Sequence, residues 1–337
     1  MTGVKIDEIN ANILRALLAD ARTSFTKMSK ENDITVVAVR SRYEKLKEIG
    51  VIKGAIMQIN PYYLGLNCTG FLGVSVKPEK LKVVKEFLDK EPYILSTWKR
   101  WREIDLGSFF ATPDLQYFNA FKDRLRSHPD IEGIQSLIYV GFLINDNPEK
   151  LRINTDVDVE QSKSKVHNPL SSNLLNKTFI ETPELQKMNP VDRNIAKLLS
   201  EDARVSFRYI AKQLKVSTSN VISRYQKMRN HNLFLRSTIT VDLRKLGYKG
   251  RVMIYFNIKL GTDFSKIQER LLKIPNLIVL VKTLGDTDML AIVPVVTFEE
   301  FFKLKASFRS IPGIKVVQID LTPSSEQWPH NFFAYVL

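Results

Sequence analysis

Two short segments, far apart in the chain, carry the same polar side chains at the same spacing. Each has a serine, an arginine and a lysine, at Ser41, Arg42 and Lys45 and again at Ser223, Arg224 and Lys227. An arginine guanidinium can donate two hydrogen bonds to the edge of a guanine base, whereas a lysine ammonium more often contacts a phosphate. These residue types indicate a surface that binds nucleic acid.

Helical periodicity separates this polar set from a predicted core. The apolar side chains fall on one side of a helix in both segments, at Val39, Tyr43 and Leu46 and at Val221, Tyr225 and Met228. The opposite side adds Val37 and Ala38 in the first segment, and Ser219 and Asn220 in the second. Asn220 can pair with two positions on adenine. A single helix face that is merely exposed to solvent could carry the same residue types. The recurrence of the set in both segments is therefore what favours a helix that reads DNA.

The recurrence extends well beyond these helices. Shifting the sequence by 182 residues aligns residues 6–65 with 188–247 without a gap, and sixteen of the sixty positions are identical. The identities include Asp20-Ala21-Arg22 against Asp202-Ala203-Arg204. One ancestral unit has therefore been duplicated.

Each unit is predicted to begin with a winged helix-turn-helix. A helical stripe ends near Arg22, Ser24 caps a short second helix, and Thr35 caps a third over residues 36–49. Residues 51–60 are predicted to form a two-stranded wing. Arg236 in the second wing is predicted to contact backbone phosphate, although a charge on a wing is as often idle.

The second part of each unit has the pattern strand, helix, strand, strand, helix, strand, which predicts a ferredoxin-like antiparallel sheet. The fold class is therefore α+β, with two winged helix-turn-helix domains and two ferredoxin-like domains in tandem. The predicted boundaries are residues 1–65 and 66–144 for the first unit, 145–186 for a polar linker, and 187–247 and 248–337 for the second unit.

The charge distribution favours a polyanionic partner, and we expect double-stranded DNA rather than an anionic membrane surface or a merely solvated face. The net charge is +14, of which residues 187–249 contribute +10 and residues 1–68 only +3. We expect a cytoplasmic protein, because the sequence shows neither a membrane-spanning run nor a signal peptide. A single cysteine and four scattered histidines predict no metal site and no cofactor.

The two units resemble the Lrp/AsnC family of regulators. The resemblance rests on Ile6, Asp7 and Ile9 with Ile13 and Leu14, on the Asp-x-Arg-x-Ser turn at Asp20 to Ser24, and on its repeat at Asp202 to Ser206. It covers both units and omits mainly the linker. It implies a DNA-binding transcription regulator in which each sheet, called a RAM domain, pairs with another and binds an amino acid near the interface.

The resemblance also implies an effector site and an assembly. Gly285, Asp286 and Asp288 resemble the family's Gly-Asp-Tyr-Asp turn, whereas the first unit has Arg102 in place of the glycine. A tight turn between strands requires glycine with or without a ligand, so both interpretations stay open. We expect the two sheets to face each other as an intramolecular pseudo-dimer, with or without further homo-oligomerisation.

An enzyme on the same fold is the alternative, because the heme-pathway siroheme decarboxylases resemble the same family. That chemistry requires acidic or basic groups that converge on a pocket. The four histidines, His128, His167, His231 and His330, occupy no repeated or paired positions. The sequence therefore predicts a regulator without catalytic activity.

Overall fold

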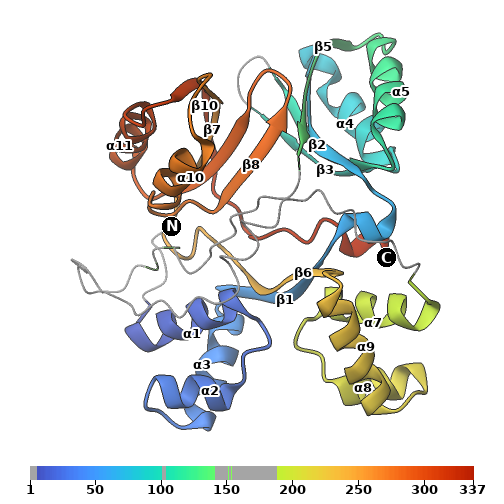
Figure 1. Cartoon of the computed structure of the whole chain (residues 1–337), viewed down its shortest axis with the longest axis vertical. Coiled ribbons are helices and arrows are strands. Elements are labelled where there is room, and N and C mark those ends of the chain that lie inside the picture. Colours follow the sequence, from blue (N-terminus) through green and yellow to red (C-terminus); the bar gives the residue numbers. More distant parts are fainter. Residues whose placement is uncertain (1–5, 101–103, 141–150, 152, 154–187) are drawn as a thin grey trace.

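The structure, a computed structural model of the chain, describes residues 6–100, 104–140, 151, 153 and 188–337. Figure 1 shows two three-helix heads at one end of the molecule and two helix-covered sheets at the other. The predicted linker, residues 145–186, lies outside the described residues except for Leu151 and Ile153, which are buried.

Each head contains three helices joined by short turns. Head one, residues 6–65, has α1 (Glu8–Ala19), α2 (Phe25–Glu31) and α3 (Val36–Glu48), and head two, residues 188–247, has α7 (Pro190–Glu201), α8 (Phe207–Leu214) and α9 (Thr218–Asn230). Ser24 and Thr35 cap α2 and α3 as predicted, and Ser206 and Ser217 do the same in head two. Each cap oxygen accepts a backbone N–H that the helix start leaves open.

The structure corrects the predicted wing. Residues 51–60 form a single strand, β1 (Ile52–Ile59), whose partner is β6 (Phe234–Val241) of head two. The pair is antiparallel and sets Ile56 opposite Thr238, two positions that correspond under the 182-residue repeat. A hairpin would need a turn within residues 51–60. The strand runs straight through, so each head supplies half of a shared two-stranded sheet.

Two ferredoxin-like units follow the heads, as predicted. The first contains β2 (Cys68–Val76), α4 (Leu81–Lys90), β3 (Ile94–Lys99), β4 (Leu106–Thr112), α5 (Leu115–Arg126) and β5 (Ile131–Tyr139). The second contains β7 (Gly250–Ile258), α10 (Phe264–Leu272), β8 (Val279–Leu284), β9 (Met289–Val295), α11 (Phe298–Arg309) and β10 (Ile314–Pro323). Short 3-10 turns lie at Pro61–Leu64, Pro78–Lys80 and Ala334–Val336.

The two units share one eight-stranded sheet, in the order β10-β7-β9-β8-β5-β2-β4-β3, and each unit supplies one four-stranded half as its own sheet. They join where β5 meets β8, with Ile138 opposite Leu284 and Tyr139 opposite Thr283. Because side chains alternate along a strand, each sheet has a helix-covered face and an opposite face. On the opposite face, Phe71 and Leu137 of the first unit pack with Met253, Tyr255 and Leu290 of the second. The helix-free faces of the two sheets therefore contact each other.

One buried ion pair crosses this contact between the sheets. Arg100, after β3, contacts Asp320 of β10, and their side chains are only 4% and 6% exposed. The guanidinium also lies 4.7 Å from the centre of the Phe71 ring and 3.4 Å from the hydroxyl of Tyr255. The amide of Gln318 donates to the same carboxylate at 2.9 Å. The charges are thus matched within the interface.

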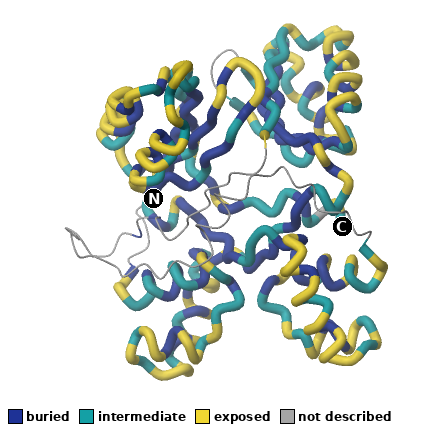
Figure 2. The backbone as a smooth tube through the Cα atoms, in the orientation of Figure 1, coloured by how far each residue is buried: buried dark blue, intermediate teal, exposed yellow. Residues whose placement is uncertain are grey.

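The C-terminal segment, residues 324–337, links the heads to the sheets. Trp328 exchanges two backbone hydrogen bonds, of 2.7 and 2.9 Å, with Val241 at the end of β6. Phe332 packs on Phe109 of β4 with ring centres 4.5 Å apart. Figure 2 shows that the strands between heads and sheets are largely buried, whereas the outer helices expose much of their surface. The segment therefore helps to hold the heads in place.

Candidate nucleic-acid interface

Helices α3 and α9 are anchored by the side predicted to face the core. Val39, Tyr43 and Leu46 of α3 are buried, as are Val221 and Met228 of α9. The rings of Phe25 and Tyr43 lie 5.4 Å apart, and Phe207 and Tyr225 form the matching contact at 5.0 Å. The core side of each third helix is therefore confirmed, and the opposite side is free to meet a ligand.

All the predicted DNA-binding residues except Arg236 lie on the opposite side of the two helices. All but the two arginines are exposed: Ser41 and Lys45 on α3, and Ser219, Asn220, Ser223 and Lys227 on α9. Thr35 and Ser217 cap the two helices, so the exposed hydroxyl and amide groups of head two follow directly on a helix start. Backbone N–H groups at a helix start favour anions such as phosphate.

Arg42 and Arg224 are half-buried because each contacts the start of the first helix in its own head. Arg42 donates to Asp7 at 2.6 Å, and Arg224 donates to Asp192 at 2.9 Å and to Asn220 at 2.8 Å. Burial opposes ionisation of Asp7, but the hydrogen bond and charge of Arg42 hold the pKa of that carboxyl below its usual value. Each arginine therefore also fixes the third helix against the first.

The outward faces of α3 and α9 differ in charge, a difference that the sequence analysis missed. Glu44 and Glu48 are exposed on α3, whereas the matching positions of α9 hold exposed Gln226 and Asn230. Aligning the two copies position by position along the helix would have revealed this difference. The carboxylates of α3 repel phosphate, so the two heads present different surfaces to DNA.

A reciprocal pair of arginines joins the two heads. Arg22 donates to the carbonyl oxygens of Ala203 and Val205, and its guanidinium lies 4.2 Å from the centre of the Phe207 ring. Burial lowers the pKa of Arg22, whose guanidinium still stays charged because arginine is the most basic of the side chains.

Arg204 of head two makes the corresponding contacts with head one. It donates to the carbonyls of Ala21 and Thr23 and lies 4.5 Å from the centre of the Phe25 ring. Because 22 and 204 correspond under the 182-residue repeat, the two contacts are related by an approximate two-fold axis. The Asp-Ala-Arg motif thus holds the heads together, a role that the sequence did not reveal.

The matches to known proteins repeat this division into two units. An AsnC-type helix-turn-helix domain matches residues 6–47 and again residues 188–229. The HTH-type transcriptional regulator FL11 of Pyrococcus horikoshii is 30% identical over 135 residues, which are 40% of this chain and 89% of that protein. The chain belongs to the Lrp/AsnC family. It is a DNA-binding transcription regulator, as the sequence predicts.

Two further comparisons show how much of the chain is similar to known proteins. LrpA of Pyrococcus horikoshii is 42% identical to this Lrp/AsnC regulator over 89 residues, 26% of this chain and 63% of that protein. Among solved structures, the siroheme decarboxylase NirDL matches with a TM-score of 0.59 and 14% identity, covering 97% of this chain and 96% of that one. At this identity the second match shows a shared fold across both units.

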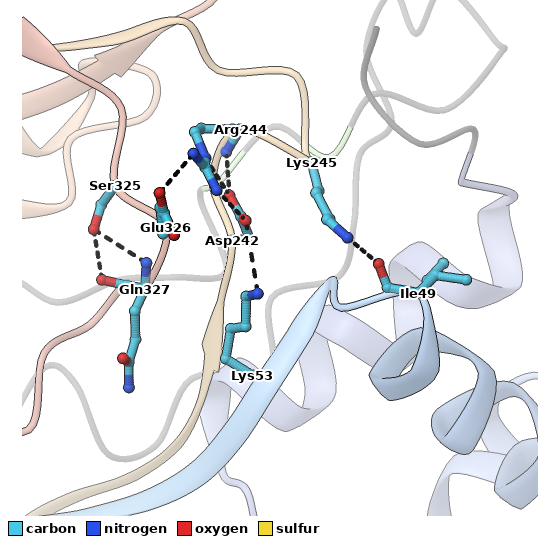
Figure 3. Close-up of polar contacts among 8 residues, drawn as sticks. All are labelled: Ile49, Lys53, Asp242, Arg244, Lys245, Ser325, Glu326 and Gln327. Atoms are coloured by element: carbon cyan, nitrogen blue, oxygen red, sulfur yellow. Dashed lines mark hydrogen bonds and ion pairs between the residues drawn. The ribbon is translucent and has the colours of Figure 1, made fainter. Parts of the chain in front are cut away.

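Figure 3 shows a charged junction of this Lrp/AsnC regulator, in which Lys53 of head one meets Asp242 of head two. The buried carboxylate of Asp242 accepts two hydrogen bonds from the guanidinium of Arg244, of 3.2 and 3.0 Å, and lies 4.0 Å from the ammonium of Lys53. Burial would raise its pKa, but the contacts with Arg244 hold the pKa of Asp242 below its usual value. Lys245 donates to the carbonyl of Ile49 at the end of α3. The junction therefore connects head one to the second unit.

The seam between the heads consists of the β1–β6 strand pair and the reciprocal contacts of Arg22 and Arg204. Arg236 lies on β6 within this seam. Its guanidinium donates to the carbonyl of Leu18 in head one at 3.2 Å, and the side chain is half-buried. Since the expected wing does not form, Arg236 is not carried on a hairpin tip. Its predicted contact with phosphate remains a prediction.

The turn at Gly285 to Asp288 exposes Gly285, Asp286 and Asp288, whereas Thr287 is buried. Gly285 has φ +141°, and a Cβ there would lie 3.1 Å from the carbonyl oxygen of Ser136, so the backbone alone requires glycine. The carboxylate of Asp288 accepts the N–H of Ile258 at 2.7 Å. In the first unit Asp105 makes the equivalent bond to Val76, whereas Arg102 lies outside the described residues.

The described part of the chain contains no cluster of histidine, cysteine and acidic side chains suited to a metal ion. Burial, with a smaller effect of Arg251, lowers the pKa of His330 to about 4, so its imidazole is neutral at pH 7. No helix among the described residues is long and apolar enough to cross a membrane.

Proposed function

We propose that this regulator binds double-stranded DNA as an intramolecular pseudo-dimer, with α3 and α9 in two major-groove half-sites. The reciprocal seam between the heads is the observation that carries the proposal. Two backbone hydrogen bonds of the seam are reciprocal as well: the N–H of Asn60 donates to the carbonyl of Leu233, and the N–H of Asp242 donates to the carbonyl of Val51. Asn60 corresponds to Asp242, and Val51 to Leu233, under the 182-residue repeat. Helix-turn-helix dimers present their recognition helices in this two-fold manner.

The proposed reading surface consists of exposed residues on the two third helices. Serine, asparagine and arginine reach base edges, and lysine neutralises phosphate, so the members are Ser41, Arg42, Lys45, Ser219, Asn220, Ser223, Arg224 and Lys227. Arg236 is proposed as a phosphate contact apart from this surface, because its guanidinium also donates to the carbonyl of Leu18 in the seam. The cytoplasm is the proposed location of the protein, together with double-stranded DNA as its proposed partner.

Head two is proposed to supply most of the affinity. Residues 187–249 carry a net charge of +10 against +3 for residues 1–68, and α9 lacks the carboxylates of α3. Each phosphate that is neutralised releases counterions, so the more basic head contributes more of the salt-dependent binding.

Alanine substitutions on a duplex selected from random sequence test this proposal. Arg224→Ala should weaken binding by about 1 to 3 kcal/mol and relax the preference at one base pair, because a bidentate contact to guanine is lost. Lys227→Ala should weaken all sequences alike and lower the salt dependence. Arg42→Ala should have a smaller effect than Arg224→Ala. Titration of the three variants at two salt concentrations gives the comparison.

The contact between Arg224 and Asp192 requires a control for helix position. Asp192→Asn keeps the shape of the partner but removes its charge, so it should leave base preference unchanged if Arg224 reads DNA directly. If Asp192→Asn relaxes the preference as much as Arg224→Ala, or if Arg42→Ala is the most damaging change, the proposed role of head two is wrong.

An amino-acid effector is proposed at Gly285, Asp286 and Asp288, where the exposed turn lies at the junction of the two sheets. An effector could change the spacing of the heads only by binding one arrangement better than another. Since Asp288 already accepts a backbone N–H, a regulator that acts without a ligand is the competing account. Calorimetric titration with amino acids separates the two accounts.

A catalytic role on the same fold is the other candidate function. The likeness to the siroheme decarboxylase NirDL supports it through the fold alone. The basic outward face of α9 and the relatives named as transcriptional regulators support a protein that is not an enzyme. Higher-order association of the chain stays open alongside the pseudo-dimer.

A further inference from the structure

The two recognition helices occupy equivalent positions but do not carry equivalent side chains. The strands of the seam pair about Ile56 and Thr238, and the arginine contacts are reciprocal, so the backbones of the heads follow an approximate two-fold axis. The residues that differ lie on the exposed face. A homodimer would present one chemical surface twice, whereas this chain presents two.

The first turns of the helices differ most in hydrogen bonding. Val37 of α3 is 77% exposed and has Ala38 beside it, whereas α9 has exposed Ser219 and Asn220 at these positions. An exposed apolar side chain suits the methyl group of thymine, and an asparagine suits the two polar positions of adenine. The same base pair cannot satisfy both helices equally.

The later turns differ in charge. Glu44 and Glu48 of α3 correspond to Gln226 and Asn230 of α9, and all four are exposed. A carboxylate can accept a hydrogen bond only, and it matches the amino group of cytosine, whereas glutamine both donates and accepts. Head one therefore selects against positions that head two accepts.

We propose that the chain recognises a non-palindromic DNA site, made of two half-sites with different sequences in a two-fold backbone arrangement. This inference rests on the proposed function, because both heads must read the major groove. A site of this kind fixes the direction in which the protein lies on DNA. The intramolecular seam makes this asymmetry permanent, since the two heads belong to one chain.

Selection from random duplex DNA, followed by titration, tests the inference. The consensus should contain two half-sites with different sequences, and palindromes built from either half-site should bind at least about tenfold more weakly, since one head then meets mismatched base pairs. A palindromic consensus, or a palindrome that binds as tightly as the selected site, would overturn the inference while leaving DNA binding intact. Failure to select any duplex would instead overturn the proposed function.

A helix-face exchange supplies the matched test. The variant V37S/A38N/E44Q/E48N gives α3 the side chains of α9 at four positions of its outward side, so it should prefer the palindrome of the head-two half-site by about tenfold or more over the selected site. Glu79→Gln with Glu86→Gln removes two exposed charges from the first ferredoxin-like unit, outside both heads, and should leave the preference unchanged. Thermal unfolding verifies that each variant is folded. An exchanged variant that is folded and keeps the original preference refutes the inference.

Discussion

Replacing Arg100 by leucine should destabilise the folded chain by about 3 to 5 kcal/mol, the effect typical of removing one partner from a buried ion pair. The substitution leaves the Asp320 carboxylate, 6% exposed, without the guanidinium that matches its charge. It also removes the contact of Arg100 with Phe71 between the two sheets. Urea unfolding followed by tryptophan fluorescence measures the change, because Trp98 lies against the Phe71 ring.

The double variant R100L/D320L is the control for this prediction. Asp320 stands opposite Met253 in the second sheet, and Leu137 stands opposite Phe71 in the first, so leucine already occupies the equivalent position in one copy. Apolar replacements of both partners are often neutral or stabilising, and we expect stability within about 1 kcal/mol of the parent. If R100L alone is as stable as the parent protein, the ion pair does not hold the two sheets together.

Removing both arginines of the seam should weaken DNA binding by about tenfold or more. Arg22 and Arg204 each donate charged hydrogen bonds to two carbonyls, worth about 1.5 to 3 kcal/mol apiece, and each lies over an aromatic ring, worth about 0.5 to 2 kcal/mol. Without them the heads sample more relative positions, and fewer of these match two grooves at once. Titration of R22A/R204A on the selected duplex measures the loss.

The two single variants and a surface variant sharpen this prediction. Because the contacts are reciprocal, R22A and R204A should lower the unfolding midpoint by similar amounts. Arg193 is exposed on α7, so Arg193→Ala should leave stability nearly unchanged. Wild-type affinity in the folded double variant would show that the seam does not position the heads for DNA.

The helices and the two sheet units were predictable because their signals are local. The caps Ser24 and Thr35, the stripe of Val39, Tyr43 and Leu46, and the alternation of strands and helices each depend on residues close in sequence. The 182-residue repeat then supported the predicted helices of both heads, since a pattern that occurs twice at the same spacing is rarely accidental.

The seam between the heads was not predictable in the same way. The pattern of residues 51–60 predicted a two-stranded wing within this segment, which was wrong. The partner of β1 is β6, about half the chain away, and local patterns carry no information on such a pairing. The same limit applies to Arg100 and Asp320, which are 220 residues apart. Arg22 and Phe25 recur as Arg204 and Phe207, but their recurrence alone does not tell which groups they contact.

Footprinting of one chain on its selected duplex tests the central claim most directly. Hydroxyl-radical cleavage should show two protected patches on one face of the DNA, with centres about 10 to 10.5 base pairs or a multiple of that distance apart. Native mass spectrometry of the same sample gives the number of chains on the duplex. The account predicts that one chain protects both patches. Protection of a single half-site by each chain, or no sequence-dependent protection, would contradict it.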